Sequence, residues 1–247
     1  MTAINNSRMG RVLPDVEPEP SPLVDRLLAL IERFGTRDID VASFQKAVRA
    51  TLACHVADLE RATEQALRQR ADQPIARKSW PGRDYTIQII YIRPREVHPC
   101  HHHHNVVSTQ MVLAGRVFGR EYERIARRPD GMLLLRPLAE GWFERGNAMQ
   151  SSEMSRNVHW FAAADEPAAM FNFNIRGYEE ATFDPRDGRP LGRRLLDATL
   201  GNAGDGLILA REIDPAEAYE RFGSRPLDAF PLPVPAPAPP QPLMAAQ

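Results

Sequence analysis

Residues 98–115 read HPCHHHHNVVSTQMVLAG and contain five of the seven histidines of the chain. A purification tag normally lies at a terminus, whereas this run lies well inside the sequence. Side chains two apart on a strand point to the same face. The run therefore offers two alternative pairs, His101/His103 and His102/His104, on opposite faces. Either pair could bind one divalent metal ion, because imidazole suits iron, nickel, copper and zinc.

A pair of histidines makes only a weak metal site, so a third ligand from elsewhere in the chain is expected. The distant histidines are His55 and His159. His55 stands among leucines at helical spacing, which predicts a packed or half-exposed helix residue. His159 lies in RNVHWFAAA, an apolar strand candidate over residues 156–164. A single buried histidine is more often structural, but the pair upstream favours a ligand at His159.

Short strand candidates surround both histidine segments. Apolar and polar residues alternate in YTIQIIYIRPREVHP, residues 85–99, until Pro94 breaks the pattern, which indicates a half-buried strand. Further candidates cover residues 106–125, 131–138 and 167–178 and are punctuated by glycines and prolines. This pattern is typical of an antiparallel sandwich or a small barrel.

Helical segments flank the strands. SPLVDRLLALIERFG begins with Ser21 as a helix cap and ends at Gly35 as a stop signal. Apolar residues recur at helical spacing over residues 41–70, which predicts a second helix. A last helix is expected over residues 214–223, capped by Asp214. The first two segments should form an N-terminal α-helical layer.

The composition of the chain argues against several classes of binding partner. The net charge of −1 gives no general attraction to nucleic acid or to an anionic membrane. No apolar run approaches the length of a membrane span, and residues 1–20 lack the apolar stretch of a secretory signal. The two cysteines, Cys54 and Cys100, cannot form a disulfide framework. A cytoplasmic protein that binds a small molecule is expected, with an oligomeric state that the sequence does not reveal.

The chain divides by composition into five regions. A polar N-terminal arm and a Pro/Ala-rich C-terminal tail are predicted to be disordered. Between them lie the helical region, a β-barrel and a C-terminal extension. The expected boundaries are 1–21 for the arm, 22–78 for the helices, 79–192 for the barrel, 193–230 for the extension and 231–247 for the tail.

The two histidine segments resemble the two motifs of the cupin barrels. HPCHHHHNVVSTQMVLAG is similar to the first cupin motif, and RNVHWFAAADEPAAMFNFNIRGY, residues 156–178, to the second. Within the cupins, the chain resembles the thiol dioxygenases, such as cysteine dioxygenase, over residues 83–190. The resemblance implies a double-stranded β-helix, or jelly-roll barrel. It also implies a three-histidine Fe(II) site that adds both atoms of O₂ to a small thiol, giving a sulfinate.

The resemblance also favours one histidine pair. In the thiol dioxygenases a glycine follows the second histidine by twelve positions, and Gly115 then selects His103 with His101. An interval of eleven, found in many carboxylate-bearing cupins, would select His102 and His104. Those cupins place a glutamate seven residues before the glycine, where this chain has Ser108. No Asp or Glu occurs between Glu96 and Glu121. The expected ligands are therefore His101, His103 and His159.

Other site residues follow from the same resemblance. Gln110, Asn172 and Asn174 are expected to face inward and to orient the imidazoles. Tyr178 resembles a tyrosine that follows the last strand in the oxidases of N-terminal cysteines. Ser108 and Asn174 stand where some cysteine dioxygenases carry a cysteine–tyrosine crosslink, so that crosslink cannot form. The expected catalytic residues are Ser108, Asn172, Asn174 and Tyr178.

Several side chains are expected to lie outside the site. Cys100 shares the strand parity of His102 and should point away from the metal. His98 and the histidines left over from the metal site, His102 and His104 in the favoured pairing, should lie at the rim of the barrel. The carboxylate-binding arginine of the family has no secure match, because Arg83 and Arg93 are expected to be solvated.

Two other functions stay open. A non-catalytic metal-binding cupin, acting as a sensor or regulator, is the first. A cupin lyase or isomerase that uses Zn or Ni through the 102/104 pair is the second.

Overall fold

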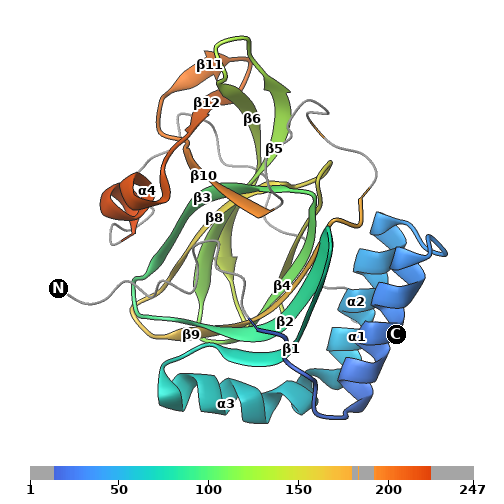
Figure 1. The fold of residues 1–247 in the computed structure, drawn as a ribbon. Helices are drawn as coiled ribbons and strands as arrows, with labels where there is room; N and C mark the ends of the chain where they lie inside the picture. Colours follow the sequence, from blue (N-terminus) through green and yellow to red (C-terminus); the bar gives the residue numbers. More distant parts are fainter. Residues whose placement is uncertain (1–13, 180–182, 184–191, 224–247) are drawn as a thin grey trace, which may run out of the picture.

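The computed structural model describes residues 14–179, 183 and 192–223 of the chain. Two β-sheets face one another, and helices cover the outer face of one of them (Figure 1). The predicted double-stranded β-helix barrel with an N-terminal helical layer is confirmed. The expectations for residues 1–13 and for the tail 231–247 lie outside the described residues.

The first sheet has five strands in the order β1-β2-β9-β4-β7, and all neighbours are antiparallel. The second has seven strands in the order β10-β3-β8-β5-β6-β12-β11. The strands of the first sheet are β1 (Gln73–Trp80), β2 (Arg83–Ile92), β9 (Ala168–Arg176), β4 (Val106–Ala114) and β7 (Ala148–Ser151). Those of the second are β10 (Gly192–Asp197), β3 (Val97–His104), β8 (Val158–Ala163), β5 (Val117–Arg127), β6 (Leu133–Phe143), β12 (Leu207–Glu212) and β11 (Asn202–Gly204).

The first helix matches its prediction. Helix α1 spans Pro22–Gly35, and the Ser21 hydroxyl caps it by accepting from the backbone N–H of Val24 at 3.2 Å. The single helix predicted over residues 41–70 is wrong. The structure instead has α2 (Val41–His55), a 3₁₀ turn (Val56–Leu59) and α3 (Glu60–Gln69). The break lets α2 pack along α1 while α3 runs beneath the sheet in another direction (Figure 1).

Two strands of the first sheet, β7 and β1, were not predicted. Residues 73–80, of which 73–78 were expected in the helical region, form β1 at the edge of the sheet. Val16 pairs with Arg77 of this strand through two backbone hydrogen bonds of 2.9 Å. Residues 14–20 of the expected N-terminal arm are thus described, and Val16 is attached to the sheet.

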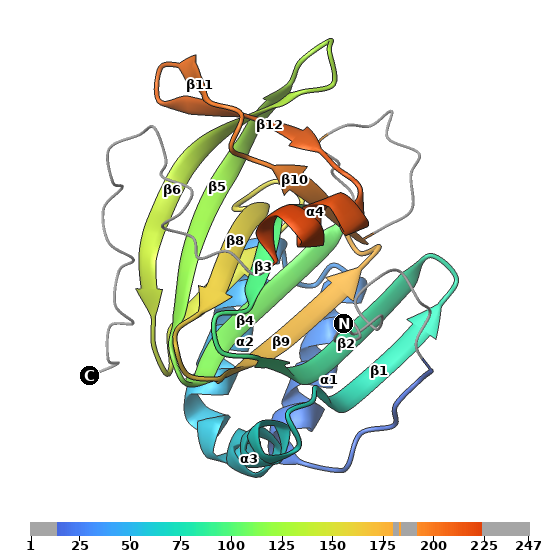
Figure 2. The ribbon, with the colours of Figure 1, turned by 90° about the vertical axis from the view of Figure 1, so that its left-hand side faces the viewer.

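The second sheet curls on its outer side into a smaller closed barrel. β10 pairs with β3 and also with β12, and β12 pairs with β6, so six strands form a ring. Helix α4 (Pro215–Phe222), with the predicted Asp214 cap, lies beside it (Figure 2). Apolar residues fill this ring, among them Tyr122, Leu135, Trp160, Leu196 and Phe222. Strands β3, β8 and β5 are therefore covered on both of their faces.

One end of the space between the two sheets is closed by apolar packing. Four connections lie at that end: β2 to β3, β4 to β5, β6 to β7, and β8 to β9. Gly115, in the second connection, has φ +71°, and a Cβ there would lie 2.5 Å from the carbonyl oxygen of Pro167. Only glycine fits this approach. The side chains that fill this end include Ile90, Ile92, Val112, Val117, Phe161 and Met170.

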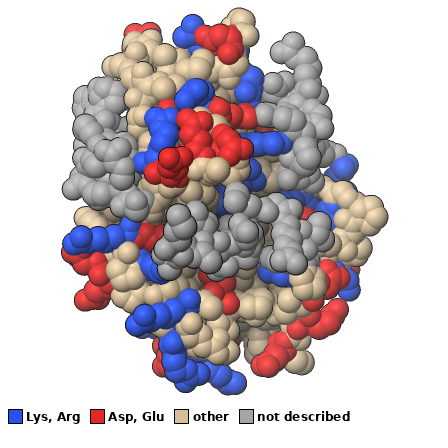
Figure 3. Space-filling model, turned by 60° about the vertical axis from the view of Figure 1, so that its left-hand side comes forward, with Lys and Arg blue, Asp and Glu red and all other residues tan. Residues whose placement is uncertain are grey.

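The surface is mixed in charge. Figure 3 shows acidic and basic side chains side by side on one face, as the net charge of −1 leads one to expect. In the part of the chain that the structure describes, no helix is long and apolar enough to cross a bilayer.

Candidate metal centre

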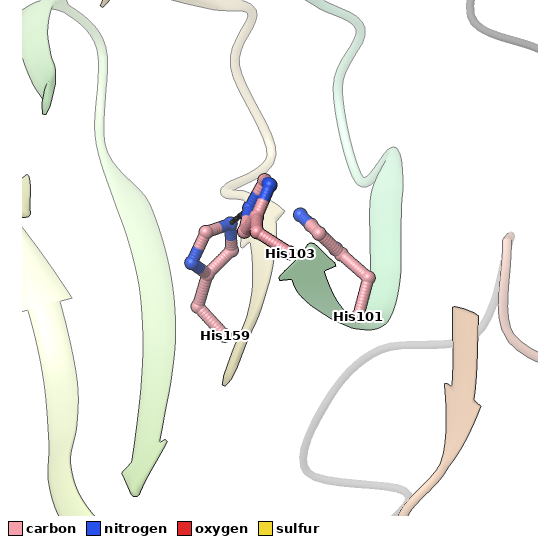
Figure 4. Close-up of side chains that lie close together, drawn as sticks. All are labelled: His101, His103 and His159. Atoms are coloured by element: carbon pink, nitrogen blue, oxygen red, sulfur yellow. Dashed lines mark hydrogen bonds between the residues drawn. The ribbon is translucent and has the colours of Figure 1, made fainter. Parts of the chain in front are cut away.

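Three histidines from two strands meet between the sheets (Figure 4). His101 and His103 lie on β3, two residues apart and on one face, and His159 lies directly opposite His101 on β8. One ring nitrogen of each lies within 4.8 Å of those of the other two. The convergence predicted for the 101/103 pair and His159 is present in the structure.

The spacing of the ring nitrogens suits a shared ion. Nε2 of His103 lies 3.3 Å from Nε2 of His159. Two ligands about 2.1 Å from one metal, at an angle between about 90° and 109°, stand about 3.0–3.4 Å apart. Nδ1 of His101 donates to the carbonyl oxygen of Pro99 at 2.8 Å. That bond leaves Nε2 of His101 with its lone pair free for a ligand role.

The three imidazoles are neutral in this environment. Burial, and to a smaller extent the charge of Arg193, lowers the pKa of His159 to about 3. Burial likewise holds the pKa of His101 and of His103 well below the usual value, with smaller contributions from the neighbouring rings and Arg193. Neutral imidazole is the form that binds a metal.

The alternative pair faces the smaller barrel. Arg124 Nη1 donates to Nδ1 of His102 at 2.9 Å, so Nε2 carries the proton and donates to Glu212 at 3.2 Å. Both ring nitrogens of His102 are thus engaged by protein groups. His104 shares the strand face of His102. Among the described residues, the 102/104 pair therefore does not join His159 in a group of possible metal ligands.

Cys100 and His98, which precede the four-histidine run 101–104, lie in different surroundings. Cys100 points into the smaller barrel with Tyr122 and Trp160, as predicted. The expectation that His98, His102 and His104 lie at the rim is wrong, because all three are buried and at most 7% exposed. The ring of His98 stacks on that of Phe161, with the ring centroids 4.4 Å apart. The pairing of β3 with β8 is irregular between His98 and His101.

Three of the four predicted catalytic residues line the space that the histidines face. Ser108 on β4 pairs with Asn174 on β9, and Gln110 pairs with Asn172. They share the face of Val112 and Met170, which pack on Phe161. Gln110 Nε2 donates to Asn172 Oδ1 at 3.2 Å. These side chains therefore lie on the sheet opposite His159.

Tyr178 lies elsewhere. Its ring packs on Phe34 of α1, with the ring centroids 6.1 Å apart, and the guanidinium of Arg83 sits 5.1 Å from its centroid. The structure therefore does not bring Tyr178 to the histidines, because the chain turns outward at Gly177 after β9. Arg83 and Arg93 are exposed, as expected.

Three residues beside the cluster were not predicted from the sequence. Glu121 on β5 is the cross-strand partner of His159; it is 4% exposed and bonds to Arg156 at 2.9 Å. Burial raises the pKa of Glu121, and Arg156 opposes that rise. Arg193 on β10 lies opposite His103. These contacts arise because strands far apart in the sequence pair with one another, so no local sequence pattern predicts them.

Asn157 is the third missed residue, and it ties the two histidine strands together. Its Oδ1 accepts from the backbone N–H of His103 at 2.9 Å, and its Nδ2 donates to the carbonyl oxygen of Ser152 at 2.6 Å. Asn157 is 1% exposed and stands two residues before His159. Its position in residues 156–178, the segment that resembles the second cupin motif, was the one sequence feature that pointed to this role.

No protein-family model matches the sequence. No curated protein matches it either. Solved structures with a similar arrangement of strands are cupin or double-stranded β-helix proteins. One is an uncharacterized conserved protein with a double-stranded β-helix domain from Klebsiella pneumoniae, 14% identical, covering 44% of this chain and 81% of that chain with a TM-score of 0.29.

Two other solved structures are also similar to part of the chain. Hydroquinone 1,2-dioxygenase in complex with Cd²⁺ and 4-hydroxybenzonitrile is 15% identical, covers 40% of this chain and 61% of that chain, and has a TM-score of 0.31. The coconut allergen cocosin is 11% identical over 36% of this chain, with a TM-score of 0.28, and the chain spans 21% of the length of cocosin. Values this low say nothing about what the chain binds or catalyses.

Proposed function

We propose that the protein is a metal-dependent oxygenase that adds O₂ to a small thiol at Fe(II) held by His101, His103 and His159. The observation that carries the proposal is the cluster itself, three buried neutral imidazoles that converge without a carboxylate among the described ligand groups. The resemblance of both histidine segments to the thiol dioxygenases supports the choice of substrate.

The residues present fit a transition metal. The 3.3 Å between the Nε2 atoms of His103 and His159 is a spacing that one ion explains, and the Nδ1 donation of His101 to Pro99 orients the third ligand. Three protein ligands leave open positions for a substrate and O₂. Bound there, Fe(II) would supply these positions and the Lewis acidity that lowers the pKa of a thiol.

The surrounding residues have separate tasks in the proposed reaction. The reaction, RS⁻ + O₂ → RSO₂⁻, forms two S–O bonds and needs no outside reductant. Burial keeps water away from the thiolate, since all three histidines are at most 6% exposed. Arg193 adds positive charge near the cluster, which favours an anionic sulfur. Asn157 holds the backbone of His103, and so its ring, in place.

Oxygen uptake with a thiol panel tests the proposal. Protein purified without an affinity tag and loaded anaerobically with Fe(II) should consume O₂ only when a thiol such as cysteine, cysteamine or 3-mercaptopropionate is added. His159→Ala should abolish that uptake. Uptake that survives this change would defeat the assignment.

The same preparation distinguishes the rivals. Tight metal binding with no thiol-dependent uptake would favour the non-catalytic sensor or regulator. Native protein that contains Zn or Ni in place of iron would favour a lyase or isomerase.

A further inference from the structure

The sheet opposite the histidines presents two rows of polar residues to the interior. The first row runs across three strands, because Asn172 on β9 pairs with Gln88 on β2 and with Gln110 on β4. Two residues further along each strand, Asn174 pairs with Thr86 and with Ser108. Cross-strand partners share a face. We call these six residues the amide wall: Thr86, Gln88, Ser108, Gln110, Asn172 and Asn174.

The amide wall faces the metal centre and not the helices. Ile90, Val112 and Met170 continue its three strands on the same face, and they pack in one cluster with Phe161 of β8. His159 stands two residues from Phe161 and shares its face. Residues of the other parity, such as Ile87 and Phe173, instead pack beneath the helices.

The amide wall is uncharged, and it holds unused hydrogen-bonding atoms. Among the described residues, Ser108 Oγ, Gln110 Oε1 and Asn174 Oδ1 are buried without a hydrogen-bond partner. A buried polar atom without a partner is costly, and native proteins rarely leave one unless a ligand or water meets it. Three such atoms in two adjacent rows indicate a place built for the polar end of a ligand.

The charge of the wall limits what that end can be. The first charged pair beyond the two rows is Asp84 with Arg176, already bonded to one another at 2.7 Å. A carboxylate against the wall would therefore lose its hydration and, among the residues that the structure describes, meet no cation on these two rows. An amide or hydroxyl group can both donate to and accept from amide side chains and needs no counter-ion.

From this geometry we infer that the ligand places an uncharged hydrogen-bonding group, an amide or a hydroxyl, against the amide wall. The inference rests on the proposed function, because the thiol end of the same ligand is taken to lie at the metal. It makes the substrate a thiol with a neutral polar tail, which differs from the carboxylate-bearing thiols of a cysteine-type enzyme. Arg193 lies beside the histidines on β10, across from the wall, and is therefore placed to act on the sulfur end.

Three thiols of nearly equal size test the inference: 3-mercaptopropionamide, 3-mercaptopropionate and 1-butanethiol. The full chain is loaded with Co(II), and each thiol is titrated while the thiolate-to-cobalt absorption band is followed. The amide should bind about tenfold more tightly than either of the other two, as expected when a buried site hydrogen-bonds one analogue and not the other. This readout reports binding and does not depend on turnover.

Variants locate the effect on the wall. Asn174→Leu should weaken binding of the amide about tenfold and leave 1-butanethiol unchanged. Gln110→Met should do the same, and it serves if the first variant does not fold. The matched control is Thr109→Val, on the same strand but facing the helix side, where its hydroxyl accepts from Gln150 Nε2 at 3.1 Å. The control should bind all three thiols as the parent does.

The outcomes separate the two proposals. Tighter binding of the carboxylate than of the amide, or an amide preference that survives both variants, overturns the inference and leaves the thiol site standing. No thiolate band with any of the three thiols overturns the proposed function itself, and the inference falls with it.

Discussion

Binding of a divalent metal should raise the thermal stability of the protein, and the increase should depend on three of the seven histidines. His101, His103 and His159 already converge in the folded chain, with ring nitrogens within 4.8 Å of one another. The unfolded chain separates His159 from the other two by more than fifty residues and cannot offer this site. A metal therefore binds the native state in preference to the unfolded state.

The size of the effect follows from mass action. At a metal concentration one hundred times the dissociation constant, preferential binding adds about 2.7 kcal/mol to the free energy of unfolding. A domain of this size gains about 2–4 °C in melting temperature for each kcal/mol. Anaerobic Fe(II), or Co(II) as a stable substitute, should therefore raise the melting temperature by about 5–10 °C.

Differential scanning calorimetry with matched variants makes the test decisive. His103→Gln and His159→Gln should each lose the metal-dependent increase. His104→Gln changes the same histidine run but on the other face of β3, so it should keep the increase in full. A 102/104 site would reverse this result for His103 and His104. An increase that survives His159→Gln would refute the argument that the three rings share one ion.

Three further predictions concern residues around the site. Gly115→Ala should lower the free energy of unfolding by about 2–4 kcal/mol in urea titrations, because φ is +71° and the new Cβ would lie 2.5 Å from the Pro167 carbonyl oxygen; an unchanged midpoint would contradict the close approach. Burial raises the pKa of Glu179 to about 7, above its unfolded value of 4.5, so the contribution of Glu179 to stability should be complete below about pH 4.5 and be lost as the pH rises to about 7. Glu179→Gln should remove up to about 2 kcal/mol of that loss, a value reduced for partial exposure, and parallel pH curves for the two proteins would count against the assignment. Asn157→Leu removes the hydrogen bond to the His103 backbone and should weaken metal affinity about tenfold in a competition titration, whereas parent-like affinity would show that Asn157 has no positioning role.

Local sequence signals predicted the elements that depend on neighbouring residues. Ser21 and Asp214 cap α1 and α4 where the sequence placed them, because a cap is a contact within one turn. Alternation of apolar and polar residues identified β2, and the parity of β3 placed Cys100 away from the metal. The expectation that His98 lies at the rim rested on no such pattern, and it is wrong because the residue is buried.

Contacts between distant strands could not be predicted in this way. Strand β1, the ring closed by β10 and β12, and the placing of Glu121 and Arg193 beside the histidines all depend on pairing partners far along the chain. Tyr178 follows β9 closely in the sequence, and yet its ring packs against α1. Its closeness in sequence to a strand of the site therefore did not predict its position.

The sequence by itself determined the chemistry available to this protein, because the number, kind and strand parity of its histidines are properties of the chain. Only the tertiary structure decided which of them meet. Pairing of β3 with β8 sets His159 opposite His101, and pairing of β9 with β2 and β4 sets an uncharged wall across from them. Such registers are chosen by the packing of whole sheets, and one residue of slip would turn every one of these side chains to the other face.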